Sequence, residues 1–230
     1  MKLRLRLTIQ RKRALGKRLF DLVTAGSALM VLALPLGIVA IIIKGSSRGP
    51  VMFRQQRVGQ FGRSFALYKF RTMHIAAVEG SEVTAEGDRR IYPVGRWLRR
   101  WKVDELPQLW NIVRGEMSMI GPRPEVPRFV GHYTAEQRRV LDTKPGLASM
   151  AQLMYPYEAK LLATVSDPER TYLTDLMPRK VAADLAYERT RSFWSDLKLI
   201  AELALLVAGK SYRADTSLRV ELDSLSREKT

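Results

Sequence analysis

The sequence lacks cysteine altogether and has only two histidines, His74 and His132, among its 230 residues. Without cysteine there is no disulfide framework, no thiolate zinc site, no iron–sulfur cluster and no cysteine nucleophile. Two histidines provide too few ligands for a histidine-rich metal site. Any chemistry that this chain performs therefore depends on carboxylates and cations.

Acidic residues are also in short supply. The chain has 39 lysines and arginines against 23 aspartates and glutamates, which gives a formal net charge of +16. Residues 1–18 contain no acidic side chain and carry half of this excess (Lys2, Arg4, Arg6, Arg11, Lys12, Arg13, Lys17 and Arg18). Such a basic run is typical of proteins that bind nucleic acid or an anionic membrane surface.

Charged residues are absent from residues 22–43, directly after the basic segment. As a helix, this run would be roughly 33 Å long, at about 1.5 Å per residue, which is enough to cross the apolar core of a bilayer. A basic cluster beside such a run indicates a membrane protein and does not suit a soluble nucleic-acid binder. The run is too long for the core of a signal peptide, and no clear cleavage site follows it.

Pro35 lies in the middle of the apolar run, where it removes a helix hydrogen bond and clashes with the preceding turn. Lys44 and Arg48 follow the run, so both of its flanks are basic. A kinked helix that spans the membrane explains this pattern, and so does a re-entrant segment that enters and leaves the same leaflet. The residues alone leave these two topologies open.

The rest of the chain predicts a mixed, mainly helical domain. Residues 51–53 and 65–68 predict two short strands joined as a hairpin, and residues 77–90 predict a polar surface loop. Helices are predicted over residues 94–103 and 178–208. The first combines tryptophans with arginines and the second ends in a short apolar stretch. Both therefore suit the membrane interface, with packing in the protein core as the alternative.

Residues 104–107 (Asp-Glu-Leu-Pro) form the most informative short motif. Proline is well tolerated only in the first turn of a helix, so a helix is predicted to begin near Glu105 with both carboxylates at its N-terminus. The helix dipole there favours an ionised Asp104 and an approaching phosphate. Acidic residues also cap helices for stability alone, so this motif by itself does not establish chemistry.

Basic residues precede and follow this motif: Lys69 and Arg71, Arg99 and Arg100, and Arg123 between Pro122 and Pro124. An arginine guanidinium binds phosphate in a bidentate way, and the flanking prolines stiffen the backbone of Arg123. Taken singly, each cation could be an ordinary surface charge. Together, paired carboxylates and several cations suit the transfer of a phosphate-bearing group with a divalent metal ion.

Several longer stretches resemble the bacterial monotopic phosphoglycosyl transferases, also called bacterial sugar transferases. The matching stretches occur in family order at residues 17–21 (KRLFD), 49–59 (GPVMFRQQRVG), 68–73 (YKFRTM), 103–111 (VDELPQLWN), 117–124 (MSMIGPRP) and 192–198 (SFWSDLK). Because several long matches in one order are far more specific than any single match, the chain is identified as a member of this family over residues 17–208.

The resemblance implies transfer of a sugar 1-phosphate from a UDP-sugar to undecaprenyl phosphate, with release of UMP, as the initiating step of exopolysaccharide, O-antigen or glycoconjugate synthesis. It implies that Asp104 attacks the β-phosphorus and forms a covalent phosphosugar intermediate, while Glu105 helps to hold Mg²⁺. A carboxylate nucleophile divides one difficult transfer into two easier steps. The resemblance further implies a set of substrate- or phosphate-binding residues: Arg123 with its neighbours Pro122 and Pro124, and, as weaker candidates, Lys69, Arg71 and Arg100.

The resemblance also implies an α+β, mainly helical, monotopic membrane protein with a re-entrant helix broken at Pro35, a small β-hairpin and interfacial amphipathic helices. Its expected segments are a basic stretch (1–18), the re-entrant helix (19–48), a catalytic domain (49–208) and a polar tail (209–230). The expected location is the cytosolic face of the bacterial inner membrane. The expected partners are a UDP-sugar, undecaprenyl phosphate and membrane lipid, without nucleic acid, and a homo-oligomer is left open.

Two departures from the family pattern matter. Leu34 precedes Pro35, where the family often has serine, and residues 147–156 differ from the family's usual Ala-Gln-Val-Asn-Gly-Arg ending, so the sugar cannot be inferred. The alternative function is a non-catalytic, membrane-surface scaffold in a polysaccharide assembly complex. Such a scaffold would explain the basic segment and the membrane helix but not the carboxylate pair among cations.

Overall fold

The computed structural model describes residues 2–75 and 82–209, with side chains from residue 15 onward. Six of the eight basic side chains predicted in residues 1–18 therefore lie outside the described residues, as does the predicted tail beyond Gly209. The predicted surface loop 77–90 is described from residue 82, where it contains no helix or strand.

The described chain is mainly helical, as predicted. Its helices are α1 (Lys2–Ser46), α2 (Pro93–Arg100), α3 (Gln108–Arg114), α4 (Pro127–Val130), α5 (Met150–Met154), α6 (Glu158–Ala163), α7 (Pro168–Thr171), α8 (Met177–Thr190) and α9 (Phe193–Val207). Its strands are β1 (Met52–Val58), β2 (Ser64–Phe70), β3 (Ser118–Ile120) and β4 (Gly146–Ala148).

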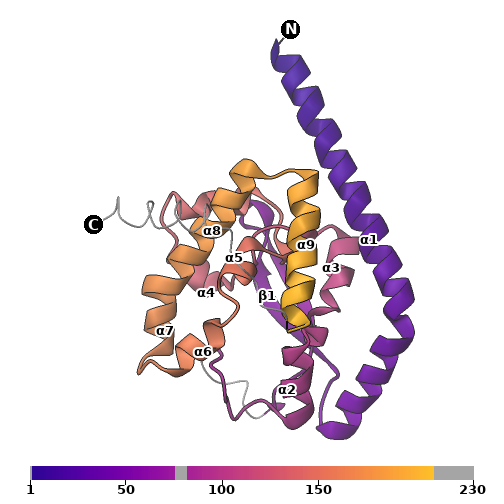
Figure 1. Ribbon diagram of the computed structural model, residues 1–230, viewed down its shortest axis with the longest axis vertical. Coiled ribbons are helices and arrows are strands. Elements are labelled where there is room, and N and C mark those ends of the chain that lie inside the picture. The colour runs from indigo at the N-terminus through magenta and orange to yellow at the C-terminus, as the bar shows by residue number, and fades with distance from the viewer. Residues whose placement is uncertain (1, 76–81, 210–230) are drawn as a thin grey trace.

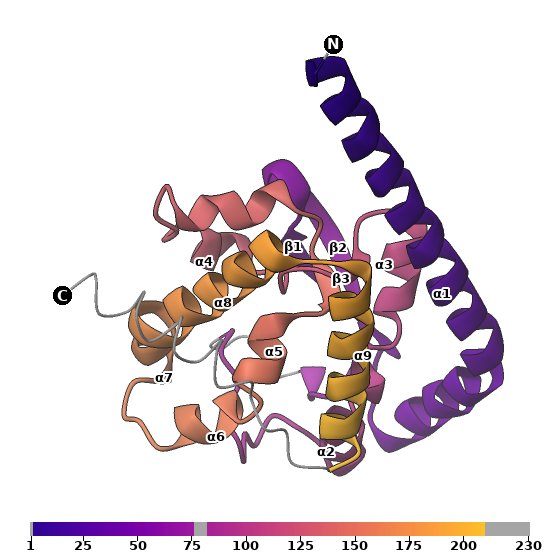
Figure 2. The same cartoon turned by 45° about the horizontal axis from the view of Figure 1, so that its top comes forward.

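The long helix α1 runs down one flank of the molecule, beside α3, and bends in its C-terminal third (Figures 1 and 2). Within the described chain it is the helix long and apolar enough to cross a membrane, over residues 15–46. Many of its apolar side chains have no protein covering them, and Met30, Val31 and Leu34 are at least 75% exposed. This pattern is consistent with the predicted monotopic membrane protein.

The inner face of α1 packs against the globular part of the chain on both sides of Pro35. Before the proline, Ala25 is fully buried in a cluster with Leu109 and Ile112 of α3. After the proline, Ile43 is fully buried against Phe70 and Leu98. Both halves of the apolar segment therefore contact the same body.

The predicted β-hairpin is confirmed, with longer strands than expected. β1 and β2 pair antiparallel from Met52↔Phe70 to Val58↔Ser64. A second, parallel pair joins β3 to β4 and was not predicted, since strands of three residues show no alternating pattern. Glycines allow the close approach beyond this pair, because a Cβ on Gly121 would collide with the carbonyl oxygen of Lys144.

The helix predicted over residues 178–208 is two helices, α8 and α9. The chain turns at Ser192, whose backbone is extended and whose hydroxyl accepts from the amide of Ser195 at 3.1 Å. The Ser195 hydroxyl bonds back to Ser192, so the two residues form a capping box that starts a new helix. The predicted helix 94–103 ends at Arg100, and Lys102 adopts the left-handed conformation with φ of +55°.

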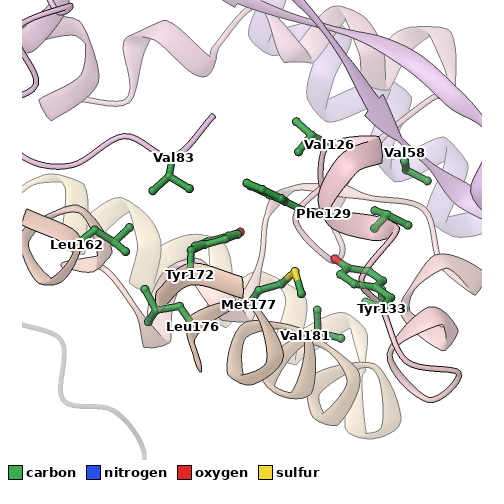
Figure 3. Close-up of a cluster of buried hydrophobic side chains, with 12 residues drawn as sticks. Val58, Val83, Val126, Phe129, Tyr133, Leu162, Tyr172, Leu176, Met177 and Val181 are labelled. Atoms are coloured by element: carbon green, nitrogen blue, oxygen red, sulfur yellow. The ribbon is translucent and has the colours of Figure 1, made fainter. Parts of the chain in front are cut away.

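An apolar cluster joins α4 and α8 to the end of β1 (Figure 3). Phe129 and Tyr172 lie at its centre, with ring centroids 5.2 Å apart. Because Val126 and Phe129 of this cluster follow residues 121–124 closely, the cluster fixes the far end of the loop that carries Arg123.

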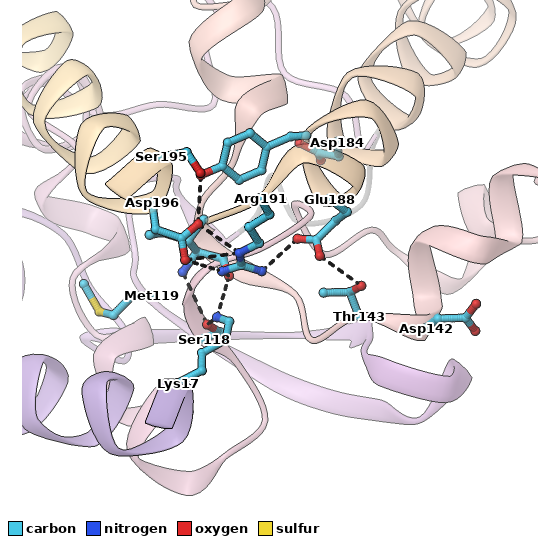
Figure 4. A network of polar contacts seen from close by, with 12 residues as sticks. Lys17, Ser118, Met119, Asp142, Thr143, Asp184, Glu188, Arg191, Ser195 and Asp196 are labelled. Carbon is cyan, nitrogen blue, oxygen red and sulfur yellow. Dashed lines mark hydrogen bonds and ion pairs between the residues drawn. The ribbon is translucent and has the colours of Figure 1, made fainter. Parts of the chain in front are cut away.

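A polar junction holds the start of that loop (Figure 4). The carbonyl oxygen of Ile120, at the end of β3, accepts from Lys17 of α1 at 3.0 Å and from Arg191 at 2.8 Å. Arg191 is itself paired with Glu188 and Asp196. Helix α1 and the α8–α9 turn therefore meet at one carbonyl group directly before the loop.

Candidate active site

The two carboxylates lie in a short 3₁₀ turn, Val103–Glu105, between α2 and α3. The left-handed Lys102 redirects the chain out of α2 and into this turn. The predicted helix start near Glu105 is shifted, since α3 begins at Gln108 with Pro107 at its N-cap. Asp104 and Glu105 are nonetheless buried, at 7% and 6% exposed, so the turn presents both carboxylates inside the protein.

Glu105 is surrounded by cations that come from distant parts of the chain. The guanidinium of Arg123 donates to Oε1 at 2.6 Å and to Oε2 at 3.3 Å. The ammonium of Lys69, on β2, donates to Oε1 at 3.2 Å. The structure therefore brings together four of the predicted site residues: Asp104, Glu105, Lys69 and Arg123.

This arrangement pushes the pKa values of the two carboxyl groups in opposite directions. Burial opposes ionisation of Glu105, but the charges of Arg123 and Lys69 outweigh it and hold the pKa of this carboxyl well below its usual range. The pKa of Asp104 is raised, first by burial and then by the negative charge of Glu105. Burial lowers the pKa of Lys69 to about 8, although Glu105 opposes this effect. Glu105 is thus the permanent anion of the pair.

Asp104 differs from Glu105 in its hydrogen bonds. Its Oδ1 atom is buried and has no hydrogen-bond partner within the described chain. Nε2 of Gln108, about one turn further along the chain, is also buried and has no hydrogen-bond partner within the described chain. The whole residue is 2% exposed. Because buried polar atoms are normally paired, these two atoms mark a place where a ligand would complete the site.

The loop that carries Arg123 is held by its backbone. The carboxylate of Asp184, on α8, accepts from the Arg123 amide at 3.2 Å and from the Ala151 amide at 2.9 Å. The carbonyl groups of Pro122 and Pro124 accept from Gly146 and from the guanidinium of Arg57, respectively. Pro122 and Pro124 are both buried, so in this structure they shape the loop while Arg123 reaches the carboxylates.

Arg71 and Arg100 make their contacts outside the cluster around Glu105. The Arg71 guanidinium donates to the carbonyl groups of Ser47, Arg48 and Pro50, and so holds the exit from α1. Arg100 is exposed, and its guanidinium lies 5.9 Å from the centroid of the Trp101 ring.

Arg99, the residue before Arg100, interacts electrostatically with the two carboxylates. Burial lowers the pKa of Arg99, while the negative charges of Asp104 and Glu105 oppose that shift. The sequence places both Arg99 and Arg100 close before the carboxylates, but it does not indicate which of the two side chains lies near them. Gln108 and Asp184 were missed entirely. Gln108 could have been found from its position four residues after Asp104, whereas nothing local marks Asp184.

The carboxylate pair also bears on metal binding. The described residues contain no group of three or more histidine, aspartate or glutamate side chains suited to a metal ion. Mg²⁺ typically needs only one or two carboxylates, because substrate phosphates and water supply its other ligands. The unpartnered oxygen of Asp104 and the adjacent Glu105 fit that requirement.

Two hollows lie outside this cluster of charges. One of about 370 Å³ is lined by residues 83–88 and 167–169 and includes none of the site residues. Another of about 250 Å³ is lined only by apolar residues of α1 and α2: Val39, Ile42, Val94, Trp97 and Leu98. The second hollow therefore lies between the membrane helix and the helix that leads into the carboxylate turn.

Comparison with known proteins identifies the family. Residues 12–210 match the family described as bacterial sugar transferase. An undecaprenyl-phosphate glucose phosphotransferase of Komagataeibacter xylinus is 38% identical over 81% of this chain and 34% of its own length. A UDP-glucose:undecaprenyl-phosphate glucose-1-phosphate transferase of Caulobacter vibrioides is 37% identical over 86% of this chain and 72% of its own length.

A third relative extends the range of sugars. The UDP-N-acetylgalactosamine-undecaprenyl-phosphate N-acetylgalactosaminephosphotransferase of Aeromonas hydrophila is 34% identical over 80% of this chain and 41% of its own length. The chain thus spans well under half of the Komagataeibacter and Aeromonas relatives and most of the Caulobacter one. With the family matched over residues 12–210, the chain belongs to the bacterial sugar transferases.

Proposed function

We propose that this protein transfers a sugar 1-phosphate from a UDP-sugar to undecaprenyl phosphate and releases UMP. The observation that carries the proposal is the unpartnered, buried oxygen of Asp104 beside a glutamate that is already neutralised by Lys69 and Arg123. A free carboxylate oxygen next to cations is the arrangement that phosphoryl transfer through a carboxylate nucleophile requires. The named activities of the relatives agree with it.

In the first step, Oδ1 of Asp104 attacks the β-phosphorus of the UDP-sugar. A bond forms between this oxygen and phosphorus, and the bond from phosphorus to the bridging oxygen breaks, so that UMP leaves with the electron pair. In the second step, a phosphate oxygen of the lipid attacks the same phosphorus and releases Asp104. Each displacement is easier than a single transfer between two anionic phosphates.

The cations bind and neutralise the phosphates during both steps. Lys69 and Arg123 are paired with Glu105 in the free protein, so the diphosphate of the donor competes with Glu105 for them. The fork of Arg123 suits two phosphate oxygens at once. When bound, Mg²⁺ would neutralise phosphate charge and lower the repulsion between donor and nucleophile, with Glu105 as its protein ligand.

The same proposal places α1 as a re-entrant helix that bends at Pro35 and leaves both flanks on the cytosolic side of the inner membrane. The re-entrant topology is supported by contacts that both ends of the apolar segment make with the same globular part of the chain. Arg18, before the apolar run, donates to the carbonyl groups of Ile112 and Val113 at 2.6 and 2.8 Å. Ser47, after the run, accepts from Arg71 at 2.7 Å. A helix that spans the bilayer would hold these flanks on opposite sides.

The interfacial helices belong to this proposal as well. Large apolar side chains are exposed on α2 and directly after it (Trp97 and Trp101) and on α9 (Phe193 and Trp194), and both helices lie beside α1. Tryptophan is favoured at the level of lipid headgroups, and arginines on the same helix suit anionic lipid. The apolar hollow between α1 and α2 suits the hydrocarbon chain of a lipid acceptor.

The decisive test is metal-dependent UMP release by the full chain in lipid nanodiscs with undecaprenyl phosphate. UDP-glucose and UDP-N-acetylgalactosamine are the first donors to supply, since relatives are named for these sugars. We expect UMP to appear with at least one UDP-sugar and to require Mg²⁺. A membrane-surface scaffold would release no UMP with any donor.

A further inference from the structure

Gln108 has the surroundings of a ligand-binding residue rather than those of a core residue. It is 2% exposed, yet its amide nitrogen has no partner among the described residues. A buried amide that stays unpaired lowers the stability of the folded protein, and an apolar side chain of the same size would avoid that cost. Packing alone therefore does not explain why a glutamine occupies this buried position.

Asn111, one turn further along α3, shows what a structural amide looks like here. It is fully buried, and its Oδ1 accepts from the amide of Tyr68 at 3.1 Å. Its Nδ2 donates to the carbonyl group of Ala66 and to Glu116, both at 2.7 Å. The two amides share a helix and a degree of burial, but only that of Asn111 is fully used by the protein.

Gln108 also follows the nucleophile closely along the chain. The residues between Asp104 and Gln108 form tight helical turns, in which the amide of Leu106 donates to the carbonyl group of Val103 and that of Leu109 to the carbonyl group of Leu106. In turns of this 3₁₀ type the chain rises by about 2 Å per residue, so Gln108 lies little more than one turn beyond Asp104. An unpartnered acceptor, Oδ1 of Asp104, and an unpartnered donor, Nε2 of Gln108, are thereby buried about one turn apart.

We propose that Gln108 is a phosphate-binding residue whose amide N–H donates to a non-bridging oxygen of the phosphoryl group that Asp104 attacks. The unpartnered oxygen of Asp104 attacks the phosphorus, and the unpartnered amide of Gln108 donates a hydrogen bond to the phosphoryl oxygen. Lys69 and Arg123 supply charge from the side of Glu105. Gln108 supplies a neutral, directional contact from the side of Asp104. This inference rests on the proposed function and adds a substrate contact to it.

The experiment compares Gln108→Met, which keeps the size of the side chain but removes the donor, with Asn111→Leu as the matched structural control. Thermal unfolding and the kinetics of UMP release are measured for both variants in nanodiscs. We expect Gln108→Met to unfold at the wild-type temperature or above, while its kcat falls by about 10- to 100-fold. We expect Asn111→Leu to unfold several degrees lower, because its hydrogen bonds are lost.

A third readout separates this inference from the proposed function: the rise in unfolding temperature caused by UDP-glucose with Mg²⁺. The rise should be smaller for Gln108→Met than for wild type, whether or not UMP is released. Wild type that is stabilised but releases no UMP would refute the proposed function and leave the Gln108 contact supported. Gln108→Met with wild-type turnover and wild-type stabilisation would overturn the Gln108 contact alone. A large fall in its unfolding temperature would also overturn it, because Gln108 would then be structural.

Discussion

Arg123 donates to both carboxylate oxygens of Glu105, at 2.6 and 3.3 Å, from a position 18 residues further along the chain. Glu105 is buried, Arg123 is partly buried, and the pair shares the site with Lys69. An ion pair withdrawn this far from water contributes little net stability, because the loss of hydration offsets most of the attraction. Under the proposed function, the two groups are held in place until a phosphate and a metal ion divide them.

Arg123→Lys tests the planar fork directly. The substitution keeps the positive charge but loses the second donor, so we expect UMP release to fall by at least about tenfold, which corresponds to about 1.4 kcal/mol of transition-state stabilisation. The control is Arg128→Lys, since Arg128 is exposed and its ion pair is with Glu169, away from the carboxylates. Equal kinetics of the two variants would make Arg123 an ordinary surface charge.

Asp104→Asn should abolish turnover without loss of stability. The amide cannot attack phosphorus, and the pKa of Asp104 is raised by burial and by Glu105, so a neutral side chain removes an unfavourable charge. Incubation of wild type with UDP-sugar alone should add the mass of one sugar phosphate, as measured by intact-protein mass spectrometry, and the variant should gain none. Near wild-type turnover of Asp104→Asn would contradict a role for this residue in the reaction.

The re-entrant topology can be tested with single cysteines, since the chain has no cysteine of its own. Gly16, Gly37 and Gly45 suit this purpose, because each lies on α1 with open space around its Cβ position. A membrane-impermeant maleimide should label Gly16→Cys and Gly45→Cys from the cytosolic side only, and Gly37→Cys from neither side. Labelling of the two flanking positions from opposite sides would show that α1 spans the membrane.

Asp184 predicts a pH dependence of stability. Burial raises its pKa to about 7, against hydrogen bonds from the amides of Ala151 and Arg123. Because the folded state holds this proton more tightly than the unfolded state, the contribution to stability is complete below about pH 4 and is lost as the pH rises through 7. The unfolding temperature of wild type, relative to Asp184→Asn, should therefore fall between pH 5 and pH 8.

Arg71→Lys should affect the fold more than substrate binding. The guanidinium spans three carbonyl groups and the Ser47 hydroxyl, which a single ammonium cannot reach together. We expect a lower unfolding temperature and a wild-type KM for the UDP-sugar. A raised KM at an unchanged unfolding temperature would instead restore Arg71 to the phosphate site that its motif suggested.

The contrast between Lys69 and Arg71 shows how far sequence reasoning reaches. The motif at residues 68–73 marks both as cations near the chemistry, but β2 ends at Phe70, so only Lys69 lies within the strand beside Glu105. Arg71 meets residues 47–50 instead, and no local pattern reveals that the exit from α1 returns to this point. The hairpin and the helices α1, α2 and α3 were predictable, since periodicity and turn residues determine them locally, whereas the short helices α4 to α7 were not predicted.

Contacts between distant segments were not predictable in the same way. Asp184 supports Arg123 across 61 residues, and β3 meets β4 through strands of only three residues. Motif order predicted that Asp104, Glu105 and Arg123 would meet. The backbone groups that hold Arg123 in place have no signature in the residue types themselves.

The way α1 is built into the molecule also bears on how the protein can be handled. Arg18 occupies the last carbonyl groups of α3, and Ala25 and Ile43 are wholly enclosed by the globular part. Removing residues 1–48 to obtain a water-soluble fragment would take away the guanidinium that donates to the last carbonyl groups of α3, and it would open two apolar clusters to water. Helix α1 is thus a wall of the globular part of the chain, and under the proposed topology the bilayer around it would act as a partner in folding rather than only as a place of attachment.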